Sequence, residues 1–204
     1  MNEIVLNEDE KDCLQELMNI AYGSATAAIS EIVDAFATLS IPRIEIINSQ
    51  ELQKHLSNFL NKELSYYISS QQFNGKISGE NLFLIDKESS TNIAYQFGLE
   101  KNEINDNELS DIVLEITNIL SSSTISQLSS DMDIPISFSP PAIEVLNTAK
   151  DIDEDYTQKY QKVIIISTQL NFEEQNIKGE LLILTTDKSI IAIKQAINDI
   201  LEEL

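Results

Sequence analysis

The chain contains two copies of a small polar group, an aspartate, a glutamate and an asparagine followed by a proline, ninety-nine residues apart. In both copies the order is Asp, three residues, Glu, two residues, Asn, twenty-two residues, Pro; the copies are Asp12, Glu16, Asn19 and Pro42, and Asp111, Glu115, Asn118 and Pro141. A carboxylate can transfer a proton or pair with a cation, and a neutral carboxamide can both donate a hydrogen bond to a water and accept one from it. Each copy therefore has the residue types needed to hold a cationic group and to position a water.

Both copies are expected on long helices, which would bring the polar side chains together. Periodic apolar residues predict helices over residues 8–38 and 107–130, and Asn7 with Glu10 three residues later has the pattern of a capping box. At about 100° per residue, the Asp, Glu and Asn of each copy fall within a sector of roughly 60°. Each helix should present a narrow ridge of carboxylates and an amide outward, while its apolar side packs inward.

The simplest explanation for such a ridge is the wet face of an amphipathic helix, and for one copy alone that explanation would be preferred. The second copy reverses this weighting, because neighbouring positions have diverged between the copies: Cys13 corresponds to Ile112, Gln15 to Leu114, and Gly23 to Ser122. Packing does not require Asp, Glu and Asn to recur together. We therefore interpret the matched polar residues as functional and the two prolines, at helix-to-strand junctions, as structural.

The rest of the chain also repeats, which predicts an α+β fold built from two helix–strand–hairpin–helix units, at about residues 1–98 and 99–204. The units should share one mixed or antiparallel sheet in a single domain with pseudo-twofold symmetry, with the two long motif-bearing helices outside. In the first unit the pattern predicts strands at 42–48, 63–73 and 76–86, a turn at Asn74-Gly75, and a helix at 89–98. In the second unit it predicts strands at 141–146, 162–172 and 177–185, a solvated acidic loop at 151–155, and a closing helix from about residue 187.

Composition excludes several classes of function. The formal net charge of −21, from 34 acidic and 13 basic residues, argues against binding to nucleic acid or to an anionic membrane. One cysteine and one histidine leave few ligands for a metal, so no metal or cofactor of its own is expected. The sequence shows no uninterrupted apolar segment for membrane insertion and no secretory leader pattern, so we expect a cytoplasmic protein.

The repeated motif resembles the signature of the CheC family of chemotaxis phosphatases, which also includes CheX and the phosphatase region of FliY. That signature is Asp or Ser, three residues, Glu, two residues, Asn, twenty-two residues, Pro, and the chain matches it twice. Residues 18–25, Met-Asn-Ile-Ala-Tyr-Gly-Ser-Ala, also resemble the family's Asn-Ile-Gly-x-Gly stretch, with Ala21 in place of the first glycine. Two copies make the chain more similar to CheC than to CheX, which has a single site and forms dimers, and the further switch domain of FliY is not expected.

The resemblance implies a function and roles for the motif residues. The substrate would be the aspartyl phosphate of a phosphorylated CheY-like response regulator, and the catalytic residues would be Glu16, Asn19, Glu115 and Asn118, with Asp12 and Asp111 supporting them or contacting the partner. The glutamates would pair with a lysine of the regulator, and the asparagines would place the attacking water. Mg²⁺ would come with the regulator, which already activates the phosphoryl group, so positioning the water is the task that is left. A neutral amide suits that task because a carboxylate would repel the phosphoryl group.

Other interpretations stay open from the sequence. The chain could be a non-catalytic module that binds a response regulator or a CheD-like deamidase, or Glu16 and Glu115 could form the acid–base pair of an unrelated hydrolase such as a glycosidase. The second copy lacks the glycine of the first, so a poorer fit to the regulator is expected there. The negative charge means that any attraction to a phosphorylated partner must be local. A monomer is expected, because a duplicated domain needs no second chain to complete its sheet.

Overall fold

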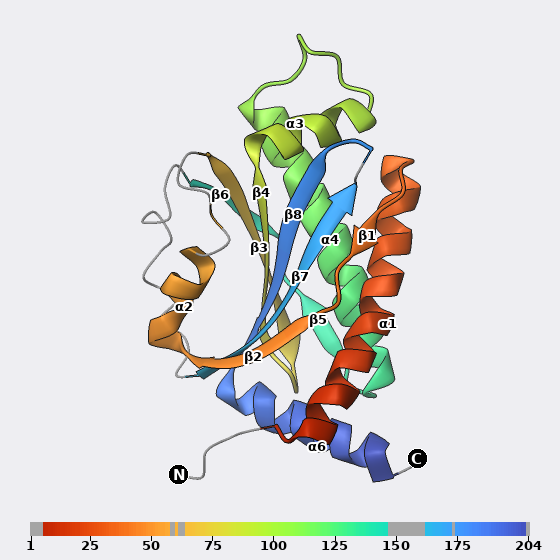
Figure 1. Ribbon diagram of the computed structural model, residues 1–204, viewed down its shortest axis with the longest axis vertical. Coiled ribbons are helices and arrows are strands. Elements are labelled where there is room, and N and C mark those ends of the chain that lie inside the picture. Colours follow the sequence, from red (N-terminus) through yellow and green to blue (C-terminus); the bar gives the residue numbers. More distant parts are fainter. Residues whose placement is uncertain (1–5, 58–59, 61–63, 147–161, 173, 203–204) are drawn as a thin grey trace.

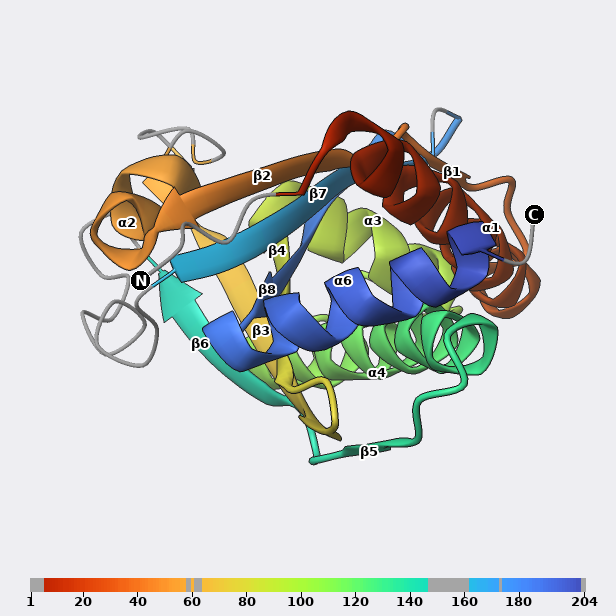
Figure 2. The same cartoon turned by 90° about the horizontal axis from the view of Figure 1, so that it is seen from below.

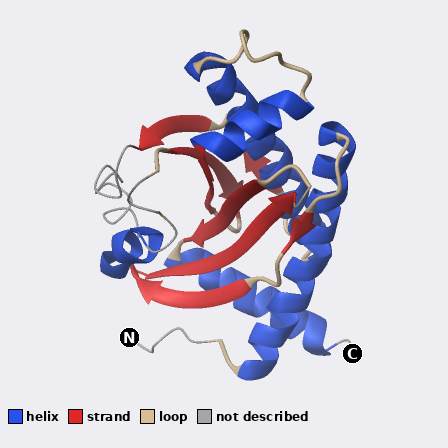
Figure 3. Ribbon diagram, turned by 45° about the horizontal axis from the view of Figure 1, so that its top comes forward, coloured by secondary structure: helices blue, strands red, loops and turns tan. Residues whose placement is uncertain are grey.

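The fold is a single curved antiparallel sheet with helices on both of its faces (Figures 1 and 3). The computed structural model describes residues 6–57, 60, 64–146, 162–172 and 174–202, and the acidic stretch at 151–155 lies outside them. In chain order the elements are α1 (Glu8–Val33), β1 (Thr38–Leu39), β2 (Arg43–Asn48), α2 (Ser49–Ser57), β3 (Tyr66–Gly75), β4 (Gly79–Asp86), α3 (Lys87–Gln96), α4 (Asp106–Asp131), β5 (Ile136–Phe138), β6 (Ala142–Leu146), β7 (Lys162–Phe172), β8 (Ile177–Thr185) and α6 (Asp187–Glu202). The expected α+β class and the sheet shared between the two units are confirmed.

The two units exchange strands within the sheet. In the described part of the chain the sheet has eight strands in the order β1-β7-β8-β4-β3-β5, with β2 also paired to β7 and β6 also paired to β3. Strands β1 and β2 of the first unit thus pair with the hairpin of the second, and β5 and β6 of the second pair with the hairpin of the first. Each unit therefore provides the edge strands that flank the hairpin of the other unit. Among the described residues, and apart from the pairing within the hairpin itself, the strands of each hairpin pair only with strands of the other half.

The strand register has the twofold symmetry that the repeated sequence predicts. At the centre, Leu82 of β4 stands opposite Leu182 of β8, and the flanking pairs mirror each other, Leu84 with Glu180 and Glu80 with Leu184. Towards the edges, Arg43 of the first unit pairs with Ser167 of the second, and its counterpart Ala142 of the second unit pairs with Ser70 of the first. Equivalent positions in the two units can therefore be compared directly.

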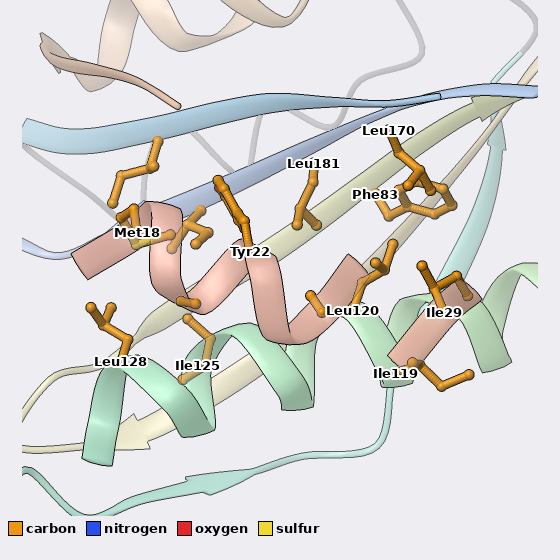
Figure 4. Packing of buried hydrophobic residues seen from close by; sticks show 14 of the residues in the cluster. Met18, Tyr22, Ile29, Phe83, Ile119, Leu120, Ile125, Leu128, Leu170 and Leu181 are labelled. Carbon is orange, nitrogen blue, oxygen red and sulfur yellow. The ribbon is translucent and has the colours of Figure 1, made fainter. Parts of the chain in front are cut away.

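The two motif-bearing helices lie side by side on one face of the sheet. Their buried sides and the inward side chains of the strands form the main core, which Figure 4 shows from close by; it includes Met18, Tyr22, Ile29, Phe83, Leu120, Leu170 and Leu181. Helix α6 crosses beneath the pair at one end (Figure 2). On the opposite face a second, smaller core contains Leu52 of α2 packed with residues of the central strands such as Leu82 and Leu182. None of the described helices is both long enough and apolar enough to cross a membrane.

Two predicted boundaries are wrong for identifiable reasons. The first helix ends at Val33 and not near residue 38, because Asp34 adopts a left-handed conformation (φ 50°) and its N–H bonds back to the Ser30 carbonyl. Residues 74–75 are not a turn but the end of β3, and the chain turns over residues 76–78 instead. That end is held extended by β5, which pairs with it. A Cβ on Gly75 would lie 2.5 Å from the Pro135 carbonyl oxygen, so the glycine allows β5 to approach.

The predicted capping box is present and is anchored to α6. Asn7 Oδ1 accepts from the Glu10 N–H at 2.8 Å, and Glu10 Oε2 accepts from the Asn7 N–H at 2.7 Å. The same Glu10 oxygen lies 3.0 Å from Nζ of Lys194 on α6, and the Glu10 side chain is only 3% exposed. Burial alone would raise the pKa of Glu10, but the Asn7 N–H and the Lys194 ammonium outweigh it and hold the pKa below its usual value.

Substitution of Lys194 by methionine is expected to destabilise the fold by about 3 kcal/mol, the low end for a broken buried ion pair, because the lysine itself is partly exposed. Since the folded-state pKa of Glu10 is depressed, its contribution is present above its unfolded pKa and is lost as the pH falls through the folded one. Urea unfolding at neutral and acidic pH checks both points. The exposed Lys188 on the same helix provides the matched control, K188M, and an equal loss in the two variants would contradict the role of the ion pair.

Candidate functional site

The polar ridge on α1 is exposed, as the spacing predicts. Asp12, Glu16 and Asn19 are all exposed, and they follow one another on successive turns at about 4.5–6 Å along the helix axis. The opposite side of α1 is fully buried, as Leu14 and Ala21 show. Because the back of the helix is anchored in the core, the ridge is a fixed surface and does not depend on a flexible loop.

The second ridge has the same construction on α4. Asp111, Glu115 and Asn118 are exposed, whereas Val113 and Leu120 behind them are completely buried. The motif prolines directly precede β2 and β6, with Pro42 buried and Pro141 half-buried. The predicted helix-to-strand junction is wrong in detail, because the short strands β1 and β5 lie between each motif helix and its proline. The structure thus brings each Asp, Glu and Asn together within its own copy.

The two ridges lie at opposite edges of the sheet. Helix α1 contacts β1 and β2, whereas α4 contacts β3, β5 and β6, which are at the other end of the strand order. The helices pack against each other between these edges (Figure 2). Glu16 and Glu115 therefore belong to separate sites. This arrangement argues against a glycosidase, whose paired carboxyl groups must flank one bond across a single cleft.

The amide of Asn118 is held from below by a buried glutamine that the motif does not include. Gln71 of β3 is 2% exposed, and its Nε2 donates one hydrogen bond to Asn118 Oδ1 at 2.9 Å and another to the Ser139 carbonyl oxygen at 3.0 Å. Sequence reasoning missed Gln71 because it lies 47 positions from Asn118 and reaches it only through the sheet topology. Its polar type at an inward-facing strand position was the one available signal.

The equivalent position in the second unit, which belongs to the framework of the first motif copy, carries a shorter side chain. Thr168 of β7 occupies it, and its Oγ1 donates to the Ser40 carbonyl oxygen at 2.6 Å, just as Gln71 donates to that of Ser139. A backbone bond repeats as well, from Ser40 to Gln169 and from Ser139 to Gln72, both at 3.0 Å. Within the described residues Asn19 has no hydrogen-bond partner for its amide, so the two asparagines are held differently.

An open hollow of about 440 Å³ lies beside the α1 ridge. It is lined by Gln15, Ser40, Ile41, Pro42, Arg43, Ser167, Thr168, Gln169 and Glu180. Burial raises the pKa of the Glu180 carboxyl, although the Gln169 amide, which donates to it at 2.7 Å, and the Arg43 charge both act in the opposite direction. The hollow therefore combines hydrogen-bonding groups with an arginine and a half-buried acid next to the first ridge.

Gly23 and Ile20 give the surface around Asn19 an open and apolar character. A Cβ on Gly23 would meet nothing within 4 Å, so the fold itself does not require glycine one turn after Asn19. A glycine in a helix interior costs about 1 kcal/mol relative to alanine, which makes its presence without a packing reason notable. Ile20, next to Asn19, is 48% exposed. These features suit a surface that another protein approaches closely.

Comparison with known proteins agrees with these observations. Residues 67–166 match the family model described as "Chemotaxis phosphatase CheX". The chain is 22% identical over 173 residues to the flagellar motor switch phosphatase FliY of Bacillus subtilis, covering 83% of this chain and 44% of that protein. The chain thus spans less than half the length of this curated relative.

Solved structures share the fold. The crystal structure of FliY from Thermotoga maritima superposes with a TM-score of 0.75 at 22% identity, over 96% of this chain and 98% of that one. CheX from Desulfovibrio desulfuricans gives 0.55 at 11% identity, over 83% and 99% of the two chains, and the FliM middle domain from a Vibrio species gives 0.62 at 13% identity, over 90% and 99%. Similarity to CheC in particular stays a prediction. Both motif copies are exposed on equivalent helices, and the matches to CheX and FliY in sequence and fold support the CheC/CheX/FliY family of chemotaxis phosphatases for this chain.

Proposed function

We propose that the chain hydrolyses the aspartyl phosphate of a CheY-like response regulator at two sites, one on α1 and one on α4. The observation that carries the proposal is the exposed Glu and Asn on successive turns of both long helices, repeated at symmetric positions. Each pair stands on a helix whose other side is locked in the core. Such a rigid surface suits a reaction in which catalysis consists mainly of positioning.

The proposed reaction needs little chemistry from this chain. A water attacks the phosphorus in line with the bond to the regulator's aspartate, that bond breaks, and the aspartate leaves as a carboxylate while both hydrogens of the water leave with the inorganic phosphate. Mg²⁺ and a lysine bound to the phosphoryl group belong to the regulator in this proposal. The amide of Asn19 or Asn118 holds the water by hydrogen bonding, which fixes the line of attack without adding negative charge.

Glu16 and Glu115 are proposed to dock the regulator through a lysine. A carboxylate one helical turn before the amide can pair with a cation while staying clear of the phosphoryl group. With a net charge of −21, the chain as a whole repels a phosphorylated partner, so this pairing has to act at short range. Asp12 and Asp111, one further turn away, extend the same acidic surface.

Replacement of both glutamates by glutamine, E16Q with E115Q, is expected to raise the KM for the phosphorylated regulator by about tenfold and to change kcat little, because the lost contact acts in binding. Decay of the phosphorylated regulator, measured over a range of concentrations, gives both constants. The control E51Q alters an exposed glutamate on α2, on the opposite face of the sheet. An unchanged KM in E16Q/E115Q would contradict the docking role.

The second candidate is a non-catalytic module that binds a response regulator or a CheD-like deamidase. The observation in its favour is the open, partly apolar surface near Gly23 and Ile20, which suits binding whether or not a reaction follows. The two candidates differ in one measurable way. A module that only binds would leave the decay of the phosphorylated regulator unchanged or slower at saturation, whereas the proposed phosphatase speeds it.

A further inference from the structure

The two sites differ in how the amide is held, and the hydrogen bonds around Gln71 fix the orientation at one of them. The Ser139 carbonyl oxygen can only accept, so Gln71 must direct its Nε2 towards it. The second N–H of that nitrogen then points to Asn118, which must present Oδ1 inward and its own NH₂ group outward. Because Gln71 is 2% exposed, water does not compete for these bonds.

The first site lacks this constraint although its framework is the same. Thr168 Oγ1 donates to the Ser40 carbonyl oxygen, as Gln71 donates to that of Ser139. A hydroxyl has only one hydrogen to donate, so Thr168 has no second donor for Asn19. The space above Thr168 is part of the 440 Å³ hollow, which Gln15 and Pro42 also line. Asn19 is therefore free to rotate, and its amide must be ordered each time a water is positioned.

We infer that Gln71 is a positioning residue that preorganises Asn118, so that the α4 site has the higher kcat, whereas the α1 site depends on its partner to order Asn19. This inference rests on the proposed function. Immobilising one side chain costs roughly 0.5–1.5 kcal/mol, and avoiding that cost corresponds to an advantage of about two- to tenfold in rate. The difference should appear in kcat, because Gln71 lies beneath the amide and is buried away from any docked partner.

The test exchanges the two supporting residues with each site isolated. In an N19A background, which leaves only the α4 site, Q71T is expected to lower kcat about two- to tenfold with little change in KM. In an N118A background, T168Q is expected to raise kcat by a similar factor. Threonine at position 71 keeps the donor to the Ser139 carbonyl that its twin Thr168 supplies, which favours retention of the fold. Q72T, at the exposed neighbouring position, is the control and should leave both constants unchanged.

A second readout needs no phosphatase activity. Side-chain NMR relaxation should show the Asn118 amide more rigid than that of Asn19, and Q71T should remove the difference. Equal mobility of the two amides in the wild type, or unchanged kcat in both exchange variants of an active protein, would overturn the inference. If the wild type fails to accelerate decay of the phosphorylated regulator, the proposed function fails, and the NMR comparison still decides whether Gln71 orders Asn118.

Discussion

Removal of both amides, N19A with N118A, is expected to abolish nearly all acceleration of phosphoregulator decay, by about 10²-fold or more at saturation, because a misplaced nucleophile cannot be compensated by tighter binding. Binding of the regulator should stay within about twofold of wild type, since the glutamates that dock it are unchanged. Phosphate release measured at fixed times gives the rate of decay, and a binding titration gives the affinity for the regulator. Each single variant should retain the activity of the other site.

Two further variants test whether the asparagines act by positioning the water with a neutral amide or merely by filling space at the site. The replacements N19D and N118D keep the shape of the side chain but bring a negative charge towards the phosphoryl group, so the double Asp variant should be no more active than the double Ala variant. The exposed Asn107, in the first turn of α4, gives the matched control N107A, which should behave as wild type. A double Ala variant with wild-type activity would contradict the assignment of both asparagines.

The second large effect expected concerns the fold: neither half of the chain should fold as a monomer. Residues 1–98 contain β3 and β4 but lack β6 and β8, their partners in the sheet, and residues 99–204 lack β2 and β4. Loss of these ladders and of the packing between α1 and α4 removes more than the 5–15 kcal/mol that typically separates folded from unfolded domains. Circular dichroism and sedimentation of the separate halves measure secondary structure and association state.

A nicked full-length chain provides the control for this experiment. Cleavage at an engineered protease site within the exposed turn at residues 101–103, after folding, keeps every strand pair and should leave a folded two-fragment complex. The two separately expressed halves should regain structure when they are mixed. A folded monomer of residues 1–98 alone would contradict the exchange of strands as the basis of stability and the expectation of one domain over residues 1–204.

Local sequence patterns were enough to predict the ridges and most of the elements. The capping box at Asn7 and Glu10, the helical period of both motif helices, and the strands at 162–172 and 177–185 are all confirmed by the structure. These features depend on residues close together in the chain, where periodicity and capping act directly. The duplication added the symmetry, because two copies of one unit can bury their apolar faces against each other.

Features that depend on long-range pairing could not be predicted in the same way. The alternation of apolar and polar residues along β3 does not reveal that β5 pairs with the end of this strand as far as Gly75. The turn predicted there is therefore wrong. Nor does it say that Gln71 will come under Asn118, since the contact requires β3 and α4 to be packed together. Conversely, the difference between Gln71 and Thr168 carries no meaning until the strand register shows that these positions are equivalent.

The most direct test of the central claim is inorganic phosphate release from an excess of phosphorylated regulator with a small, catalytic amount of this chain. The account predicts many turnovers per chain, a rate well above spontaneous decay, and loss of that rate in the N19A/N118A variant that still binds. Release at the spontaneous rate in the presence of wild-type protein that demonstrably binds the regulator would contradict the phosphatase proposal and leave the chain as a binding module.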